Sequence, residues 1–214
     1  SPGEYGVRGS SVAALQDEYL GDFELRDLLD TKQSLFDQAK VRYSGRLWLT
    51  EHFRCMPEII EFSNRLIYAP LNKRLEPLRQ FGQDRLVPLK RVWVPHGELP
   101  SSKKINKQEA EAVVQAVIRC HEDPAYEGKS FGVISLLSTS RQAEWIQHCL
   151  LERLGPEALL ARQLICGSAY DFQGDERDIV FLSMVSALAE NQSRLPKLGG
   201  NRSDFQRFNV ATSR

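Results

Sequence analysis

A continuous apolar run, Phe131–Leu137, is the feature that most constrains the fold of this chain. A strand with one solvated face alternates apolar and polar residues, whereas a continuous run favours a strand covered on both faces. A helical pattern follows over 139–154, and two further short apolar runs, Leu164–Cys166 and Ile179–Val185, come later. Strands that alternate with helices predict a parallel α/β sheet, in which ligands meet loops beyond the carboxyl ends of strands.

Other elements are predicted from apolar spacing and from residues that suit helix ends. Helical patterns cover 25–39, 57–68 and 106–120, where Pro57 suits a first turn and Asn106 suits a cap. Short strands are predicted over 46–49 and 87–94, a long loop over 186–203, and a last helix capped by Asp204. The tryptophans of these elements are interpreted as packing residues: Trp48, Trp93 and Trp145.

Composition limits the classes of protein to which the chain can belong. Its 214 residues, 42% of them hydrophobic, suffice for one well-packed domain with a small appendage. Lys plus Arg and Asp plus Glu each number 28, which argues against a strongly basic nucleic-acid binder but leaves room for a local basic groove. Nothing in the sequence has the pattern of a signal peptide or the length of an apolar membrane span, so we expect no membrane partner. Four scattered cysteines favour a cytoplasmic, reducing setting without a cysteine zinc site: Cys55, Cys120, Cys149 and Cys166.

Two short segments only superficially resemble parts of an ATP site. Gly128-Lys129-Ser130 has the ending of a phosphate-binding loop, but Asp123 stands where that loop needs glycine. The segment also opens a strand, whereas a phosphate-binding loop opens a helix, so we interpret it as a polar turn. The acidic pair Asp175-Glu176 precedes the strand 179–185 and does not follow it, which argues against a magnesium site.

Three segments resemble motifs of superfamily 1 nucleic-acid helicases, in the branch that includes nonsense-mediated-decay and replication-maturation helicases. They are similar to motifs IV, V and VI: LTEHFRCMPEIIEFSN (Leu49–Asn64), GSAYDFQGDERDIVFLS (Gly167–Ser183) and DFQRFNVATSR (Asp204–Arg214). The resemblance implies the second, C-terminal RecA-like domain over 46–214, a parallel sheet flanked by helices with the P-loop NTPase fold but no P-loop of its own. Residues 1–45 would then be a loop and helical lead-in from a first RecA-like domain, and the chain would end within motif VI.

The resemblance assigns catalytic roles to Arg54, Arg214 and Gln173. Both arginines match residues that reach the γ-phosphate, and Gln173 matches a residue of the motif V turn that couples the sites. Guanidinium is permanently charged and fork-shaped, which suits the charge spread over phosphoryl oxygens. The alternative for each arginine is a surface salt bridge.

The resemblance also assigns nucleotide-binding roles to Phe53, Gly174 and Glu176. Phe53 stands where relatives usually have a tyrosine that stacks on adenine, although a core phenylalanine is the alternative. Gly174 belongs to the motif V turn. Glu176 matches a carboxylate that accepts from ribose hydroxyls, with a solvated acid beside Arg177 as the alternative. His52 and Cys55 depart from the commoner QYRMHP form, and we interpret His52 as a surface histidine without a metal role.

A nucleic-acid groove is implied by Ser168 and by a basic loop. Ser168 matches a small hydroxyl residue that contacts the nucleic-acid backbone. Four positive charges in the segment 186–208 could line the groove of a single strand, or could belong to a solvated loop: Arg194, Lys197, Arg202 and Arg207. The first three are the predicted nucleic-acid-binding residues.

The sequence therefore predicts part of an ATP-dependent DNA or RNA helicase. ATP and Mg²⁺ would be held mainly by an upstream P-loop domain of the same polypeptide, and the chain by itself would be inactive. We expect Arg54, Gln173, Glu176 and Arg214 on one edge of the sheet. Two alternatives stay open: an ATPase or translocase that remodels nucleic-acid complexes without unwinding, and a non-catalytic nucleic-acid-binding or scaffold module.

Overall fold

The computed structural model describes residues 9–24, 26, 29, 34–82, 85–98, 105–137, 140–187 and 202–213. The chain divides into two compact units, residues 1–49 and 50–214, and each is treated by itself.

The first unit contains helices α1 (Gly9–Tyr19) and α2 (Leu35–Arg42). A capping box begins α2, because the Ser34 hydroxyl accepts the Asp37 N–H and the Asp37 carboxylate accepts the Ser34 N–H. Neither helix holds a fully buried residue. The predicted helix over 25–39 is thus present in part, and its residues 25, 27, 28 and 30–33 lie outside the described residues.

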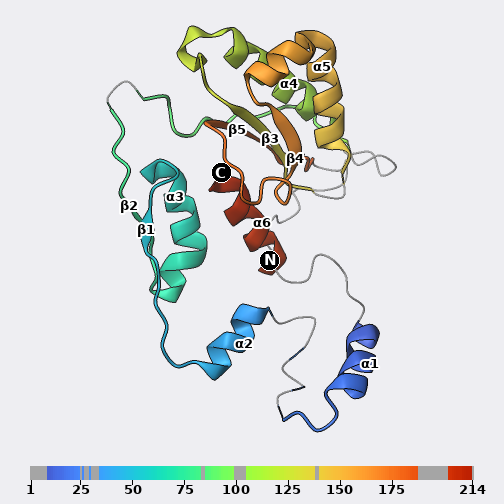
Figure 1. Cartoon of the computed structure of the whole chain (residues 1–214). Helices are drawn as coiled ribbons and strands as arrows, with labels where there is room; N and C mark the ends of the chain where they lie inside the picture. The colour runs from blue at the N-terminus through green and yellow to red at the C-terminus, as the bar shows by residue number, and fades with distance from the viewer. Residues whose placement is uncertain are drawn as a thin grey trace. The chain divides into compact units, whose positions relative to one another are not determined.

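Three parallel strands form the larger of two sheets described in the second unit, and the parallel sheet agrees with the sequence-based prediction (Figure 1). They are β3 (Phe131–Ser135), β4 (Ile165–Ser168) and β5 (Ile179–Ser183), in the spatial order β4-β3-β5. In the central strand, Gly132 lies opposite Ile165 on one side and Val180 on the other. The central position explains why β3 is buried along its whole length.

Helices cover one face of this sheet, and a loop and a helix cover the other. Helices α4 (Lys107–Glu122) and α5 (Gln142–Ala161) pack on the face that includes Phe131 and Val133 (Figure 1). The opposite face includes Ile134, which packs with Phe172 of the β4–β5 connection and with Ala211 of α6 (Arg202–Thr212). Alternate residues of β3 therefore enter two separate cores, which accounts for its continuous apolar sequence.

Helix α3 (Pro57–Ser63) lies between two short strands, β1 (Glu51–His52) and β2 (Glu76–Pro77), which pair in parallel. The predicted helix over 57–68 is shorter as an α-helix, because a π-helical turn over Asn64–Tyr68 and a 3₁₀ turn over Ala69–Leu71 continue it. The buried Asn64 side chain accepts the N–H of Leu75 and donates to its carbonyl, at 2.8 and 2.9 Å. These two bonds hold the returning chain beside α3.

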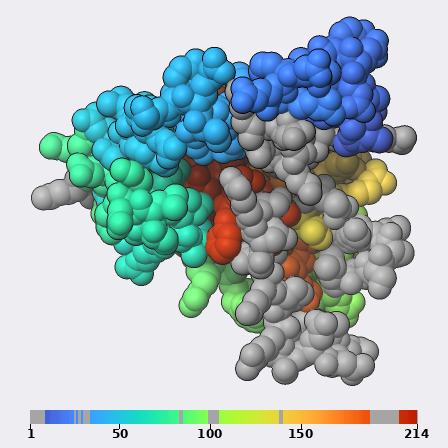
Figure 2. Space-filling model, turned by 90° about the horizontal axis from the view of Figure 1, so that it is seen from below, coloured from blue at the N-terminus to red at the C-terminus, as the bar shows by residue number. Residues whose placement is uncertain are grey.

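Helix α6 packs against α3 and the π-helical turn. The rings of Phe62 and Phe208 lie 6.0 Å apart, and the Asn209 amide donates to the Tyr68 hydroxyl at 3.1 Å. Near the end of α6, the hydroxyls of Ser63 and Thr212 lie 3.2 Å apart. Figure 2 shows dark red surface of α6 beside the teal surface around α3. The segment that resembles motif VI is thereby fixed against the segment that resembles motif IV.

Several predicted elements differ from the structure. Residues 46–49 and 87–94 form no strand, and the exposed fractions of Trp48 and Trp93 are 45% and 72%, so their interpretation as packing residues is wrong. Trp145 does pack against the core. A strand needs a neighbouring edge as well as apolar residues, and the described residues offer none to these two segments. The last helix begins at Arg202, which places the predicted cap, Asp204, inside its first turn.

Candidate functional site

An ion pair joins Arg54, in the turn after β1, to Glu176, in the connection before β5. Arg54 Nε donates to Glu176 Oε2 at 2.8 Å, although the two residues are 122 positions apart in the sequence. Arg54 Nη1 also reaches the Ser213 carbonyl at 3.5 Å, the upper limit of a hydrogen bond. The expected juxtaposition of Arg54 and Glu176 is therefore confirmed, while Arg214, the residue after Ser213, lies outside the described residues.

The ion pair lies near the amino ends of the strands. Two residues beyond Glu176, the Asp178 carboxylate accepts both the N–H and the O–H of Ser130 at 2.8 Å, directly before β3. The connection from β4 thus runs back along the sheet to the start of β5. Glu176 thus lies in the connection that enters β5, whereas Arg54 follows the carboxyl end of β1. Where a ligand binds relative to the strand ends stays a prediction.

Asp178 and Ser130 form a reciprocal link between the starts of β3 and β5. The Asp178 N–H also donates to the Ser130 hydroxyl at 3.0 Å. Burial raises the pKa of Asp178, but the hydrogen bonds from Ser130 and the charges of Lys129 and Arg79 outweigh it, and its pKa lies below its ordinary value. The segment Gly128-Lys129-Ser130 is therefore a polar turn that opens a strand, as predicted.

The connection between β4 and β5 contains a tight turn that exposes Gln173. The Gln173 N–H donates to the Tyr170 carbonyl at 3.0 Å, and the Asp175 N–H donates to the Phe172 carbonyl at 3.2 Å. Gly174 has a φ of 84°, in the left-handed region that favours glycine. Phe172 is fully buried and anchors the turn to the sheet. The functional roles of Gln173 and Gly174 stay predictions.

The two neighbouring acids of this connection, Asp175 and Glu176, form ion pairs with different arginines. The nearly buried Arg177 donates from Nη1 to Asp175 Oδ1 at 2.6 Å and from Nε to the Gln163 carbonyl at 2.8 Å. The carboxylate of Glu176, whose side chain is 67% exposed, instead pairs with Arg54. Among the described residues, no group of three His, Cys, Asp or Glu side chains could hold a metal ion.

The turn that carries Arg54 is held by its neighbours. His52 Nε2 accepts the Cys55 N–H at 3.1 Å and lies 3.0 Å from Cys55 Sγ. Burial raises the pKa of the Cys55 thiol to about 11, while burial and then the charge of Arg54 lower the pKa of His52. On the other side, Arg79 Nη1 donates to the Arg54 carbonyl at 3.4 Å. His52 is thus a partly buried acceptor within the turn, a contact that its interpretation as a surface histidine did not include.

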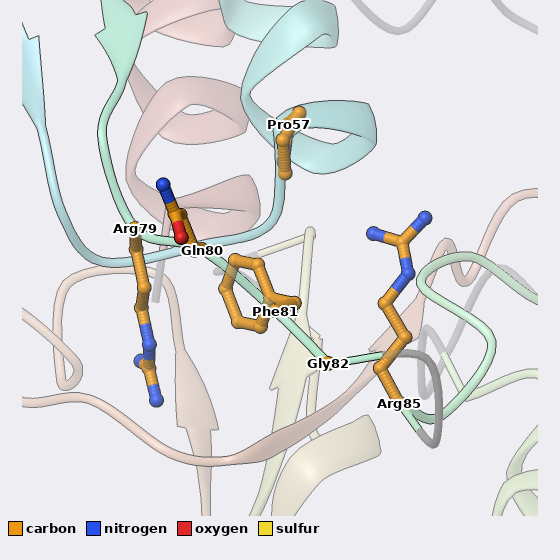
Figure 3. Close-up of a pocket in the computed structure, with 6 residues that line it drawn as sticks. All are labelled: Pro57, Arg79, Gln80, Phe81, Gly82 and Arg85. Carbon is orange, nitrogen blue, oxygen red and sulfur yellow. The ribbon is translucent and has the colours of Figure 1, made fainter.

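An open hollow lies beside this turn, between the start of α3 and the chain that follows β2 (Figure 3). The Arg79 guanidinium lies 5.0 Å from the ring centroid of Phe81, and Arg85 makes a two-bond ion pair with Glu58. Sequence reasoning missed these arginines because they lie in an irregular segment without a recognisable motif. The hollow is lined by Pro57, Arg79, Gln80, Phe81, Gly82 and Arg85.

The remaining predicted site residues are Phe53, Ser168 and the basic residues after β5. Phe53 is 60% exposed, so the alternative of a core phenylalanine is wrong, and stacking on adenine stays a prediction. The Ser168 N–H and hydroxyl both donate to Asp171 Oδ2, at 2.7 and 2.8 Å, so the hydroxyl proton is already used within the chain. Arg194 and Lys197 lie outside the described residues, as does the side chain of Arg202, the first residue of α6.

A family model matches most of the chain. Within the described part of the chain, no helix has the length and apolar character needed to cross a membrane. No curated protein matches the chain. A family model described as AAA domain, AAA_12, matches residues 31–214, which include every strand of the structure and both partners of the Arg54–Glu176 pair. With its parallel, RecA-like α/β sheet, the chain belongs to this AAA domain family of helicase-like P-loop NTPase domains.

Proposed function

We propose that this chain is the C-terminal RecA-like domain of an ATP-dependent superfamily 1 helicase that acts on DNA or RNA. Arg54 and Arg214 would reach an ATP site shared with an upstream P-loop domain. The observation that carries the proposal is the exposed Arg54–Glu176 pair, where the segments resembling motifs IV and V meet beside the end of the segment resembling motif VI.

An exposed arginine in this position suits phosphoryl transfer. Charge spreads over the phosphoryl oxygens in the transition state, and a guanidinium can donate two parallel hydrogen bonds to them. An exposed ion pair contributes only about 0–1 kcal/mol, so Arg54 can exchange Glu176 for phosphate at little cost. Arg54 and the ATP-binding P-loop would lie on different domains. Hydrolysis would therefore require the cleft between these domains to close.

The remaining nucleotide contacts fit residues of the same turn and connection. The exposed ring of Phe53 is available to stack on adenine, and the Glu176 carboxylate can accept from ribose hydroxyls. Gln173 is exposed on its tight turn. Its amide side chain would form hydrogen bonds to a phosphate and to the backbone of this chain. Mg²⁺ bound with ATP on the P-loop domain would supply positive charge that neutralises the phosphates.

The proposed nucleic-acid partner is a single strand of DNA or RNA. The chain as a whole carries no net charge, so only a local cluster of positive charge can attract phosphates. In this proposal Arg194, Lys197 and Arg202 form that cluster. Ser168 would have to exchange its bond to Asp171 for a phosphate oxygen.

A second candidate is a non-catalytic nucleic-acid-binding or scaffold module. It is favoured by the same ion pair, since an arginine satisfied within the chain also suits a purely structural role. Nucleic-acid-stimulated ATP hydrolysis by the natural polypeptide separates the two candidates. A strand-displacement assay then separates a helicase from a translocase that remodels complexes without unwinding.

The decisive variants are Arg54→Ala and Arg214→Ala in the natural polypeptide that joins this chain to its P-loop domain. Each should lower turnover at saturating ATP on the order of 10³-fold or more, with binding of a non-hydrolysable analogue largely retained. Lysine at either position should restore only part of the rate, because ammonium lacks the guanidinium fork.

Arg153→Ala is the matched control, because Arg153 makes an ion pair with Glu111 across α5 and α4. Arg207 is less suitable, since its guanidinium joins α6 to the Leu136 carbonyl and pairs with Asp204. Near-normal turnover in both the Arg54 and Arg214 variants would reject the arginine-finger assignment.

A further inference from the structure

The turn that presents Arg54 is closed by a side-chain acceptor. The Cys55 N–H, one residue beyond Arg54, donates to His52 Nε2 at 3.1 Å. A ring nitrogen that accepts a hydrogen bond carries no proton, so the imidazole is neutral with its proton on Nδ1. The buried Cys55 thiol stays protonated at neutral pH and lies 3.0 Å from the same nitrogen.

The bond fixes the backbone on the carboxyl side of Arg54. On the other side of the turn, the Arg54 carbonyl accepts from Arg79, and the His52 carbonyl accepts the Leu78 N–H at 2.9 Å. The Arg54 backbone is thus set between β2 and the imidazole. A misplacement of about 1 Å in a catalytic group can lower a rate on the order of 100-fold.

We propose that His52 is a positioning residue for Arg54, which acts as the Nε2 acceptor that closes the turn from 52 to 55. The proposal rests on the proposed function, because it assigns His52 to the geometry of the arginine finger. His52 touches neither nucleotide nor reacting atoms in this scheme, and its effect passes through the backbone of Arg54.

Protonation of His52 would open the turn. An Nε2 that carries a proton cannot accept the Cys55 N–H, so the two donors would face each other. The charged and titratable groups around His52 are Arg54 and Cys55 on its own turn, Glu51 and Glu76 on the paired strands, and Arg79 beyond β2, while Glu176 pairs with Arg54. Burial and the charge of Arg54 hold the pKa of His52 below its ordinary value, so the turn stays closed at neutral pH.

Two amide variants distinguish the effect of the hydrogen-bond acceptor from the effect of losing the imidazole ring. In His52→Gln the amide oxygen can reach about the place of Nε2 and accept the Cys55 N–H without titrating. In His52→Asn the shorter side chain carries the same amide but reaches only about as far as Nδ1. A difference between the two therefore reports the position of the acceptor and not merely the loss of imidazole.

The test measures nucleic-acid-stimulated ATP hydrolysis by the natural polypeptide across a series of pH values. His52→Asn should lower kcat about tenfold or more, with little change in KM, because transition-state contact is lost. The kcat of the wild type should fall on acidification, as His52 gains a proton. His52→Gln should keep a rate close to that of the wild type at neutral pH and should lose this fall.

Two results would overturn the inference: kcat of His52→Asn equal to that of the wild type, or an unchanged acid fall in His52→Gln. If His52→Asn fails to fold, the pH profile of His52→Gln still decides. Arg54→Ala, assayed in parallel, separates this inference from the proposed function. Normal turnover in Arg54→Ala would reject the proposed function, whereas a crippled Arg54→Ala beside a normal His52→Asn would reject only the role of His52.

Discussion

The ion pair between Arg54 and Glu176 is exposed to solvent, which limits what it contributes to stability. The exposed fractions of the two side chains are 41% and 67%. Water screens the attraction between the charges, and two long side chains lose freedom when they pair. The proposed role of Arg54 in turnover should therefore be separable from any role in folding.

Arg54→Ala in the 214-residue chain should lower the free energy of unfolding by less than about 1 kcal/mol. Urea denaturation followed by circular dichroism measures this change, with Arg153→Ala as a control of the same type. A loss of several kcal/mol would mean that Arg54 holds the fold together. It would favour the hypothesis of a non-catalytic scaffold module.

At this scale, the sequence identified the pair but not its supports. Arg54 and Glu176 were found because each lies in a segment that resembles a motif, and the fold then brought them together. The contact of His52 to the Arg54 turn was not predicted and Arg79 was missed, because both contacts depend on how β1, α3 and β2 meet. No local pattern in a sequence encodes such a contact.

Among the elements, the connection from β4 to β5 depends on a close approach to the sheet. A Cβ atom added to Gly132 would lie 2.7 Å from Phe172 Cε1 and 3.1 Å from Arg177 Cγ. Phe172 is fully buried and Arg177 nearly so, which leaves neither side chain free to move aside. Glycine in the central strand thus lets the connection that carries Glu176 lie flat on β3.

Gly132→Ala should lower the free energy of unfolding by about 1–3 kcal/mol, the usual cost of overpacking a core. Urea denaturation measures the loss. A double-mutant cycle with Phe172→Leu should show that the two changes are coupled, since the smaller side chain gives the new methyl group space. Additive effects of the two substitutions would contradict direct packing between residues 132 and 172.

Predicted elements succeeded where local signals agreed. For α4, the helical spacing and the Asn106 cap point to the same start, and Asn106 does accept the Glu109 N–H at 3.1 Å. The strands β3, β4 and β5 follow their short apolar runs. The predicted strands over 46–49 and 87–94 failed because apolar composition cannot show whether a neighbouring strand is present.

For the whole molecule, alternating strands and helices predicted a parallel α/β sheet, and the structure confirms it. The order β4-β3-β5 was not predictable, because it depends on the direction in which each connection crosses the sheet. That order, with the return of the β4–β5 connection, places Glu176 near the amino ends of the strands.

The 214-residue chain by itself should bind ATP only weakly and should not hydrolyse it. Its sequence holds no phosphate-cradling loop, and its formal net charge is zero. Stacking of adenine on Phe53 contributes about 1–3 kcal/mol by analogy with base–aromatic stacking. Arg54 would add little, because a phosphate contact replaces its bond to Glu176. A binding energy of this size corresponds to a dissociation constant weaker than about 1 mM.

Titration calorimetry of the chain with ATP tests this expectation, and Phe53→Ala should remove most of whatever binding is found. Added salt should weaken any phosphate contact made by Arg54 but should leave the stacking on Phe53 nearly unchanged, because screening acts on charge and not on apolar contact. A dissociation constant in the micromolar range would show that the chain binds the triphosphate through groups other than Arg54 and Phe53. The proposal that an upstream P-loop domain holds ATP would then have to be given up.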